Sequence, residues 1–184
     1  MNRFPRLTPE TMSPAQRVVA AEISAGPRGE VRGPFIALIH NAELARRMQA
    51  LGEHLRWGNK LPPPLLELAV LYTARRWNCQ HEWYMHEKLA RKAGLDSGIC
   101  EAIAAGREPQ GMSADEALVY GACKQAHQSG RLDDETFTAL SARFGLDGVL
   151  DLLVLNGYYS AMAMVLNTAG MPLPGDAAAP LREI

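Results

Sequence analysis

Residues 65–94 read LLELAVLYTARRWNCQHEWYMHEKLARKAG and predict two consecutive helices. The first helix, 65–76, is apolar on almost every side apart from Glu67, which is typical of a buried helix. The second helix, 79–93, ends at Gly94 and carries its charged residues mainly on the face opposite Trp83. Neither segment shows the alternating pattern of a strand. The stretch therefore predicts an all-α protein with a buried helix followed by an amphipathic one.

Helix signals continue in both directions from this pair. Capping residues, prolines and glycines divide the chain into segments of helical pattern, and no segment shows strand alternation with hairpin turns. The 184 residues suit one domain, so we expect a single all-α helical bundle of about eight helices spanning 1–184, with irregular arms at 1–12 and 171–184. The predicted helices cover residues 14–24, 41–57, 65–76, 79–93, 96–105, 113–128, 133–144 and 147–169, and residues 35–39 are expected to form a short apolar turn.

Composition excludes several classes of protein. The net charge is −1 and no long basic run occurs, which excludes the electrostatic pattern of a nucleic-acid-binding protein. The three cysteines are widely spaced and form no disulfide framework, and the N-terminus lacks the apolar stretch of a signal peptide. We therefore expect a cytoplasmic protein. The uncharged segment 152–175 contains Asn156 and Pro172, so it predicts a buried or subunit-interface helix, and hence a homo-oligomer, rather than a membrane span.

One face of the second helix carries three ionisable groups. At 100° per residue, Cys79, Glu82 and His86 lie on the same side as Trp83, which is the inward side. Helices rarely direct a thiol, a carboxylate and an imidazole inward without a functional reason. Two structural alternatives stay open: a solvent-exposed salt bridge at the rim between Glu82 and His86, four residues apart, and Cys79 as a small packing residue.

Glu67 is the fourth candidate, because a buried carboxylate is costly unless it is paired or protonated. Pairing with Arg75, eight residues further along a similar face, is the structural alternative. The segment from His81 to His86 has one residue too many for the HExxH zinc motif. Metal binding by Glu67, Glu82 and His86 remains open at this point, although our reading of the site includes neither a metal nor a cofactor.

The spacing of these four residues resembles a known superfamily. Glu67, Cys79, position 82 and His86 follow the E-x11-C-x2-C-x3-H pattern of AhpD-like peroxidases, except that Glu82 replaces the second cysteine. The segment 76–86, followed by Ala90 and Gly94, is similar to the signature of carboxymuconolactone decarboxylase-like proteins. The resemblance implies an AhpD-like helical fold, assembly into trimers or hexamers, and a reaction without a cofactor.

For activity, the resemblance implies decarboxylation of a small carboxylated lactone or a related compound. His86 would be the general acid/base, Glu82 would orient it or move protons itself, Glu67 would be a second acid/base, and Cys79 would line the pocket. Two alternatives remain: an antioxidant, peroxiredoxin-like thiol peroxidase that uses Cys79, and a non-catalytic helical oligomer. The candidates for substrate binding are Arg56, Arg75 and Trp83.

Overall fold

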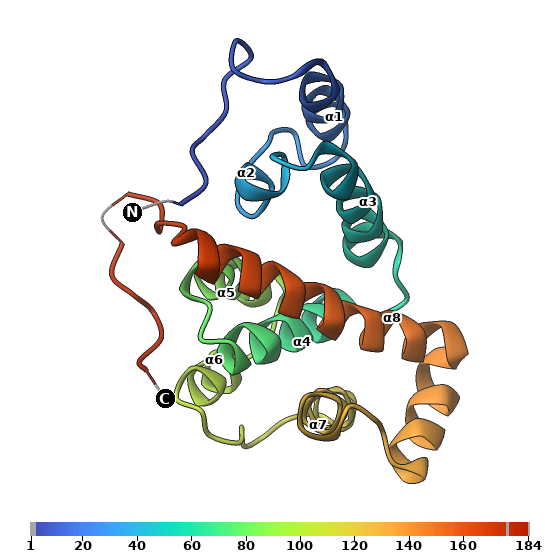
Figure 1. Ribbon diagram of the computed structural model, residues 1–184. Coiled ribbons are helices and arrows are strands. Elements are labelled where there is room, and N and C mark those ends of the chain that lie inside the picture. Colours follow the sequence, from blue (N-terminus) through green and yellow to red (C-terminus); the bar gives the residue numbers. More distant parts are fainter. Residues whose placement is uncertain (1–2, 176, 184) are drawn as a thin grey trace. The chain divides into compact units, whose positions relative to one another are not determined.

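The computed structural model describes residues 3–175 and 177–183, which form helices and connecting loops without a strand (Figure 1). The all-α prediction is confirmed, and so is the expected number of about eight helices. In chain order the elements are α1 (Pro14–Ala25), α2 (Phe35–Leu38), α3 (Ala42–Glu53), the π-helical turn η1 (His54–Gly58), α4 (Pro63–Arg76), α5 (Gln80–Ala93), α6 (Ser97–Ala104), α7 (Ala114–Ser129) and α8 (Asp134–Ala169).

Capping residues explain where these helices begin. Ser113 accepts a hydrogen bond from the backbone of Glu116, whose carboxylate in turn accepts from the Ser113 backbone, so both satisfy N–H groups that a helix start leaves free. Ser13 and Gln16 form the same capping box before α1. The helix starts expected at both sites are confirmed.

Two boundaries differ from the sequence-based expectation. Helix α4 begins at Pro63, two residues earlier than expected, because proline suits the first turn, where its missing N–H has no intrahelical partner. Cys79 caps α5 from an extended conformation instead of forming its first helical residue. The break expected at Gly145 is present, since this residue has φ 75° and ψ 171° inside α8.

The described chain divides into two compact units. The first contains the described residues up to Gly58 together with Met164–Pro172, and the second contains Asn59–Ala163 with the described residues from Leu173 onward. Helix α8 begins in the second unit and ends in the first. The expected single domain spanning 1–184 stays a prediction.

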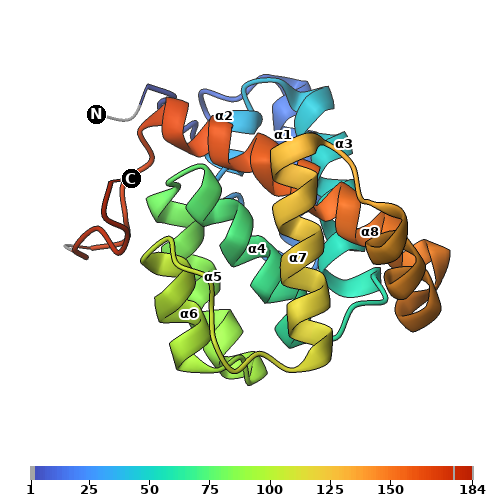
Figure 2. The ribbon, with the colours of Figure 1, turned by 90° about the horizontal axis from the view of Figure 1, so that it is seen from below.

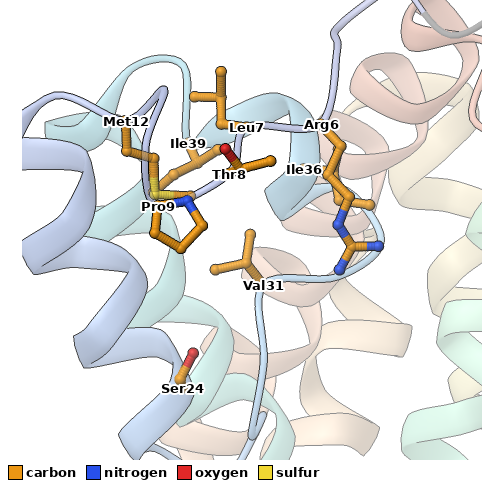
Figure 3. Close-up of a pocket in the computed structure, with 9 residues that line it drawn as sticks. All are labelled: Arg6, Leu7, Thr8, Pro9, Met12, Ser24, Val31, Ile36 and Ile39. Atoms are coloured by element: carbon orange, nitrogen blue, oxygen red, sulfur yellow. The ribbon is translucent and has the colours of Figure 1, made fainter.

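Within the first unit, α3 packs against α1 and α2. Arg46 of α3 pairs with Glu22 of α1 at 2.8 Å, and the N-terminal arm donates a backbone hydrogen bond from Arg3 to the Ala169 carbonyl. A cavity of about 300 Å³ lies between this arm and α2, lined by residues 6–9 of the arm and by Ile36 and Ile39 (Figure 3). It contains none of the predicted site residues.

Helix α4 forms the centre of the second unit, where it packs against α5, α6 and α7 (Figure 2). Ten of its fourteen residues are buried, as its nearly uniform apolar sequence predicts. Burying α4 on several sides fixes its rotation relative to α5, because each turn of apolar side chains fills a defined space. This packing decides which residues of the two helices face each other.

Helix α8 is long and apolar enough to cross a membrane by length and composition. The buried core helix of a soluble protein passes the same test, and half of the most apolar window of α8 is buried within the structure. Its buried side chains include those of Leu152, Leu155, Tyr159 and Met162. The structure therefore leaves the expected absence of a membrane span as a prediction.

Candidate functional site: an imidazole between two carboxylates

Packing of α5 on α4 brings Glu67, Glu82 and His86 into direct contact. His86 Nδ1 lies 2.6 Å from Glu67 Oε2, and its Nε2 lies 3.3 Å from Glu82 Oε2. Glu67, Glu82 and His86 are 7%, 5% and 3% exposed, respectively. We call these three residues the triad. The alternative of a solvent-exposed ion pair between Glu82 and His86 is therefore wrong.

The geometry of the triad favours a protonated imidazole. Both ring nitrogens face a carboxylate oxygen, and only the imidazolium can donate from both nitrogens at once. Burial by itself lowers the pKa of His86, but the charges and hydrogen bonds of Glu67 and then of Glu82 outweigh it and raise the pKa above the usual histidine range. His86 can therefore carry a proton near neutral pH, where a general acid needs one.

Tyr159 of α8 completes the surroundings of His86. Its ring meets the imidazole edge to face, with centroids 5.0 Å apart and planes at 84°, and Tyr158 packs against Tyr159 in a similar way. Sequence reasoning did not include Tyr159 among the site residues. Its neighbours give no signal for the role, because only the packing of α8 brings it within reach of a residue 73 positions earlier.

Cys79 is buried at the beginning of α5, one turn before Glu82. Burial raises the pKa of its thiol to about 12, the negative charge of Glu82 adds to this effect, and the backbone N–H groups of Glu82 and His81 oppose it. The reactive form of a cysteine is the thiolate, so this thiol is a weak nucleophile at neutral pH. Cys79 is thus a buried thiol, one turn from Glu82, whose reactive thiolate form is disfavoured.

The structure gives Arg75 a different partner from the one considered for it. Its Nη1 donates to Asn78 Oδ1 and to the backbone carbonyl of Arg182, both at 2.8 Å. Because Glu67 bonds His86 instead, the suggested pairing of Glu67 with Arg75 is wrong. A role for Arg75 in substrate binding stays a prediction.

The other two substrate-binding candidates have contacts of their own. Trp83 is buried and donates from Nε1 to Glu87 Oε2 at 3.3 Å. Arg56 lies in η1, within the first unit, and its guanidinium stands 5.3 Å from the ring centroid of Trp57. Their contribution to substrate binding stays a prediction.

The structure bears on the metal site considered for Glu67, Glu82 and His86. His86 contacts a carboxylate through each of its ring nitrogens. Over the described ranges, no group of three or more histidine, cysteine, aspartate or glutamate side chains has an arrangement that could hold a metal ion. The arrangement of the triad is better suited to moving protons.

Both the sequence and the fold of this chain resemble known proteins. The sequence model of the carboxymuconolactone decarboxylase family matches residues 42–122, a little under half of the chain. The fold is similar to a crystal structure described as an alkylhydroperoxidase AhpD core, an uncharacterized peroxidase-related protein from Ralstonia eutropha JMP134. The TM-score is 0.74 at 20% sequence identity, over 95% of this chain and 93% of that one. The predicted resemblance to the superfamily is confirmed. None of the curated proteins matches the sequence.

The match to the family model and the similarity of fold cover different extents of the chain. Glu67, Cys79, Glu82 and His86 all lie within the segment that matches the family model, whereas Tyr159 lies outside it. The structural similarity extends over nearly the whole chain, but at 20% identity it concerns the fold alone. The choice between decarboxylase and peroxidase chemistry depends on the site itself.

Proposed function

We propose that this protein is a cofactor-free enzyme that decarboxylates a small carboxylated lactone or a related compound, with His86 as the general acid. The observation that carries the proposal is the buried imidazole held between Glu67 and Glu82, at 2.6 Å and 3.3 Å. Its raised pKa keeps a proton available at neutral pH. A buried and partnered proton donor fits a reaction whose difficult intermediate is a carbanion.

The reaction would take place in two steps. The bond between the substrate carboxylate and the ring carbon breaks, carbon dioxide leaves, and the bonding electron pair is delocalised into the conjugated lactone carbonyl. His86 then donates a proton to the resulting carbanion and recovers one from water, so that the net change is loss of carbon dioxide and uptake of one proton. Nε2 is the better placed donor, because its contact with Glu82 is the longer of the two.

The two carboxylates would have different roles. The short contact between Glu67 and Nδ1 fixes the orientation of the ring and stabilises its positive charge. Glu82 contacts the nitrogen that would face the substrate, so it could accept a proton from water and pass it to His86. Arg75 and Arg56 remain candidates for binding the substrate carboxylate, and Trp83 for lining its site.

A thiol-dependent peroxidase is the second candidate, because Cys79 lies at the start of α5, where backbone N–H groups favour a thiolate. Peroxide would oxidise the Cys79 thiolate to a sulfenic acid with loss of water or alcohol, and a second thiol would then form a disulfide with release of water. Burial and Glu82 oppose the first step, since they raise the pKa of Cys79 to about 12. We therefore favour the decarboxylase.

The test is carbon dioxide release from a panel of carboxylated lactones by the purified protein. We expect release by the wild type, its loss in His86→Gln, and partial retention in Cys79→Ser. Glu87→Gln is the matched control, because Glu87 is another carboxylate of α5 that bonds Trp83 and Arg91 instead of His86. Peroxide turnover that disappears in Cys79→Ser would favour the peroxidase, and inactivity in both assays would favour a non-catalytic oligomer. We also propose a cytoplasmic homo-oligomer, a trimer or a hexamer.

A further inference from the structure

The end of the chain docks at the connection between α4 and α5. The side-chain amide of Gln80 donates from Nε2 to the Leu181 carbonyl and accepts from the Leu181 N–H through Oε1, both at 2.9 Å. Arg75 Nη1 donates to the carbonyl of the next residue, Arg182, at 2.8 Å. The Leu181 side chain is buried at 3% exposure. Three hydrogen bonds and one apolar anchor therefore hold this segment.

This contact recognises a stretch of backbone and one side chain. Gln80 pairs with both backbone polar groups of a single residue, Leu181, and Arg75 binds the next carbonyl. Arg182 contributes only its backbone, and its side chain is exposed, as is that of Glu183. Backbone bonds supply affinity and the leucine supplies selectivity, which is the mode by which many proteins bind peptides in trans.

The contact also leaves one buried group unsatisfied. Arg75 is buried, yet its Nε has no acceptor, and its guanidinium is held by oxygen atoms of an amide and a carbonyl instead of a carboxylate. A buried donor without a partner weakens the state that buries it. The contact is therefore weaker than its three hydrogen bonds alone suggest.

Residues of this contact lie on both sides of Cys79. Asn78, which accepts from Arg75, has a φ of 46°, a conformation that non-glycine residues rarely adopt. Gln80 directly follows Cys79 and is the first residue of α5. The docked segment therefore bonds Gln80 directly and is linked to Asn78 through Arg75, on either side of the buried Cys79.

We propose that Arg75 and Gln80 form a receptor for a peptide segment anchored by a leucine, that residues 181–182 of the chain occupy it reversibly, and that their release opens the turn carrying Cys79. We call this pair of residues the strand receptor. The inference concerns binding and thiol access, so it does not depend on the proposed decarboxylation. A tethered segment has an effective concentration on the order of millimolar, which allows an intrinsically weak contact to stay occupied.

The first test measures peptide binding to the full-length chain. Leu181→Asp should release the segment, because it places a charge where a leucine is buried. A fluorescent synthetic peptide of residues 177–183 should then bind this variant with a dissociation constant of about 1 mM or below. Binding should be at least about tenfold weaker to the wild type, whose receptor is occupied, and to Leu181→Asp combined with Gln80→Ala. Equal binding to all three proteins, or no binding to the folded Leu181→Asp chain, would overturn the proposal.

The second test measures access to Cys79 by the rate of iodoacetamide labelling, located by mass spectrometry. Cys100 and Cys123 are also buried and serve as internal controls. Cys79 alone should be labelled several-fold faster in Leu181→Asp, and added peptide should restore protection. Arg182→Ala should behave as the wild type, since it keeps the backbone contact. Gln80→Ala provides a milder release should Leu181→Asp not fold. Faster labelling of all three cysteines, or of none, would refute the proposed link.

Discussion

Glu67→Gln tests the electrostatic basis of the candidate site. The substitution keeps the shape of the side chain and a group able to hydrogen-bond His86, but it removes the negative charge 2.6 Å from Nδ1. An opposite charge within about 4–6 Å typically shifts a pKa by about 1–3 units, and each unit corresponds to about 1.4 kcal/mol. We therefore expect the pKa of His86 to fall and the imidazolium to lose stability on the order of a few kcal/mol.

The effect on folding stability has a defined dependence on pH. A histidine whose folded-state pKa is raised above its unfolded value contributes stability that is fully present below about 6.5 and is lost as pH rises through the folded-state pKa. The variant loses this contribution. Its deficit in unfolding free energy should therefore be largest at and below the ordinary histidine pKa, and it should shrink at higher pH, where wild-type His86 also becomes neutral.

The assay is titration of the His86 ring by NMR, with denaturant unfolding at several pH values as the second measurement. Neither needs a substrate, so the result does not depend on the reaction assigned to the site. Glu87→Gln should leave the His86 titration unchanged, because this carboxylate bonds Trp83 and Arg91. An unchanged or raised His86 pKa in Glu67→Gln would refute the view that Glu67 keeps the imidazole protonated.

Three further predictions concern the kink, the surface and Glu82. Gly145→Ala should destabilise the protein by about 1–3 kcal/mol in denaturant unfolding, since φ 75° with ψ 171° suits only glycine, whereas Gly121→Ala, in open space within α7, should stabilise it by about 0.5–1 kcal/mol. Leu150→Lys should reduce self-association in light scattering, because Leu150 lies between Leu146 and Val154 in an exposed apolar stripe of α8. Leu44→Lys, at an exposed leucine of α3, is the control. A monomeric wild type would contradict the expected oligomer. Glu82→Gln should lower the pKa of both Cys79 and His86. The expected results are faster alkylation of Cys79 and titration of the His86 ring at lower pH. No change in either measurement would refute the role of the Glu82 charge.

The sequence predicted the helices better than the contacts between them. Helix starts depend on local capping chemistry, so Ser113 with Glu116 was sufficient to predict the beginning of α7. The break at Gly145 was equally local. The partner of Glu67 was not, because helical spacing alone was compatible with both Arg75 and His86. Only the packing of α5 against α4 decides between them.

The contact of Arg75 explains why the remaining part lay beyond sequence reasoning. Its partner is the backbone carbonyl of a residue 107 positions later, and a carbonyl has no signature in the sequence. Gln80 and Leu181 illustrate the same limit. A glutamine at a helix start is an ordinary polar residue in the sequence, and only the structure shows that a distant segment of the chain bonds to it. Tyr159 belongs to this group too, because its contact with His86 depends on the path of α8.

The charge of Glu82 affects the key residue of each candidate reaction, Cys79 for the peroxidase and His86 for the decarboxylase. In the pattern of AhpD-like peroxidases that this sequence resembles, the position of Glu82 holds a second cysteine, which could form a disulfide with the first. Here the carboxylate acts in two directions: it raises the pKa of the neighbouring Cys79 thiol and, with Glu67, the pKa of His86. One negative charge thus makes the thiol less reactive and the imidazole a better proton carrier. Both effects of the Glu82 charge support the proton transfer that we propose for this site over the peroxidase alternative.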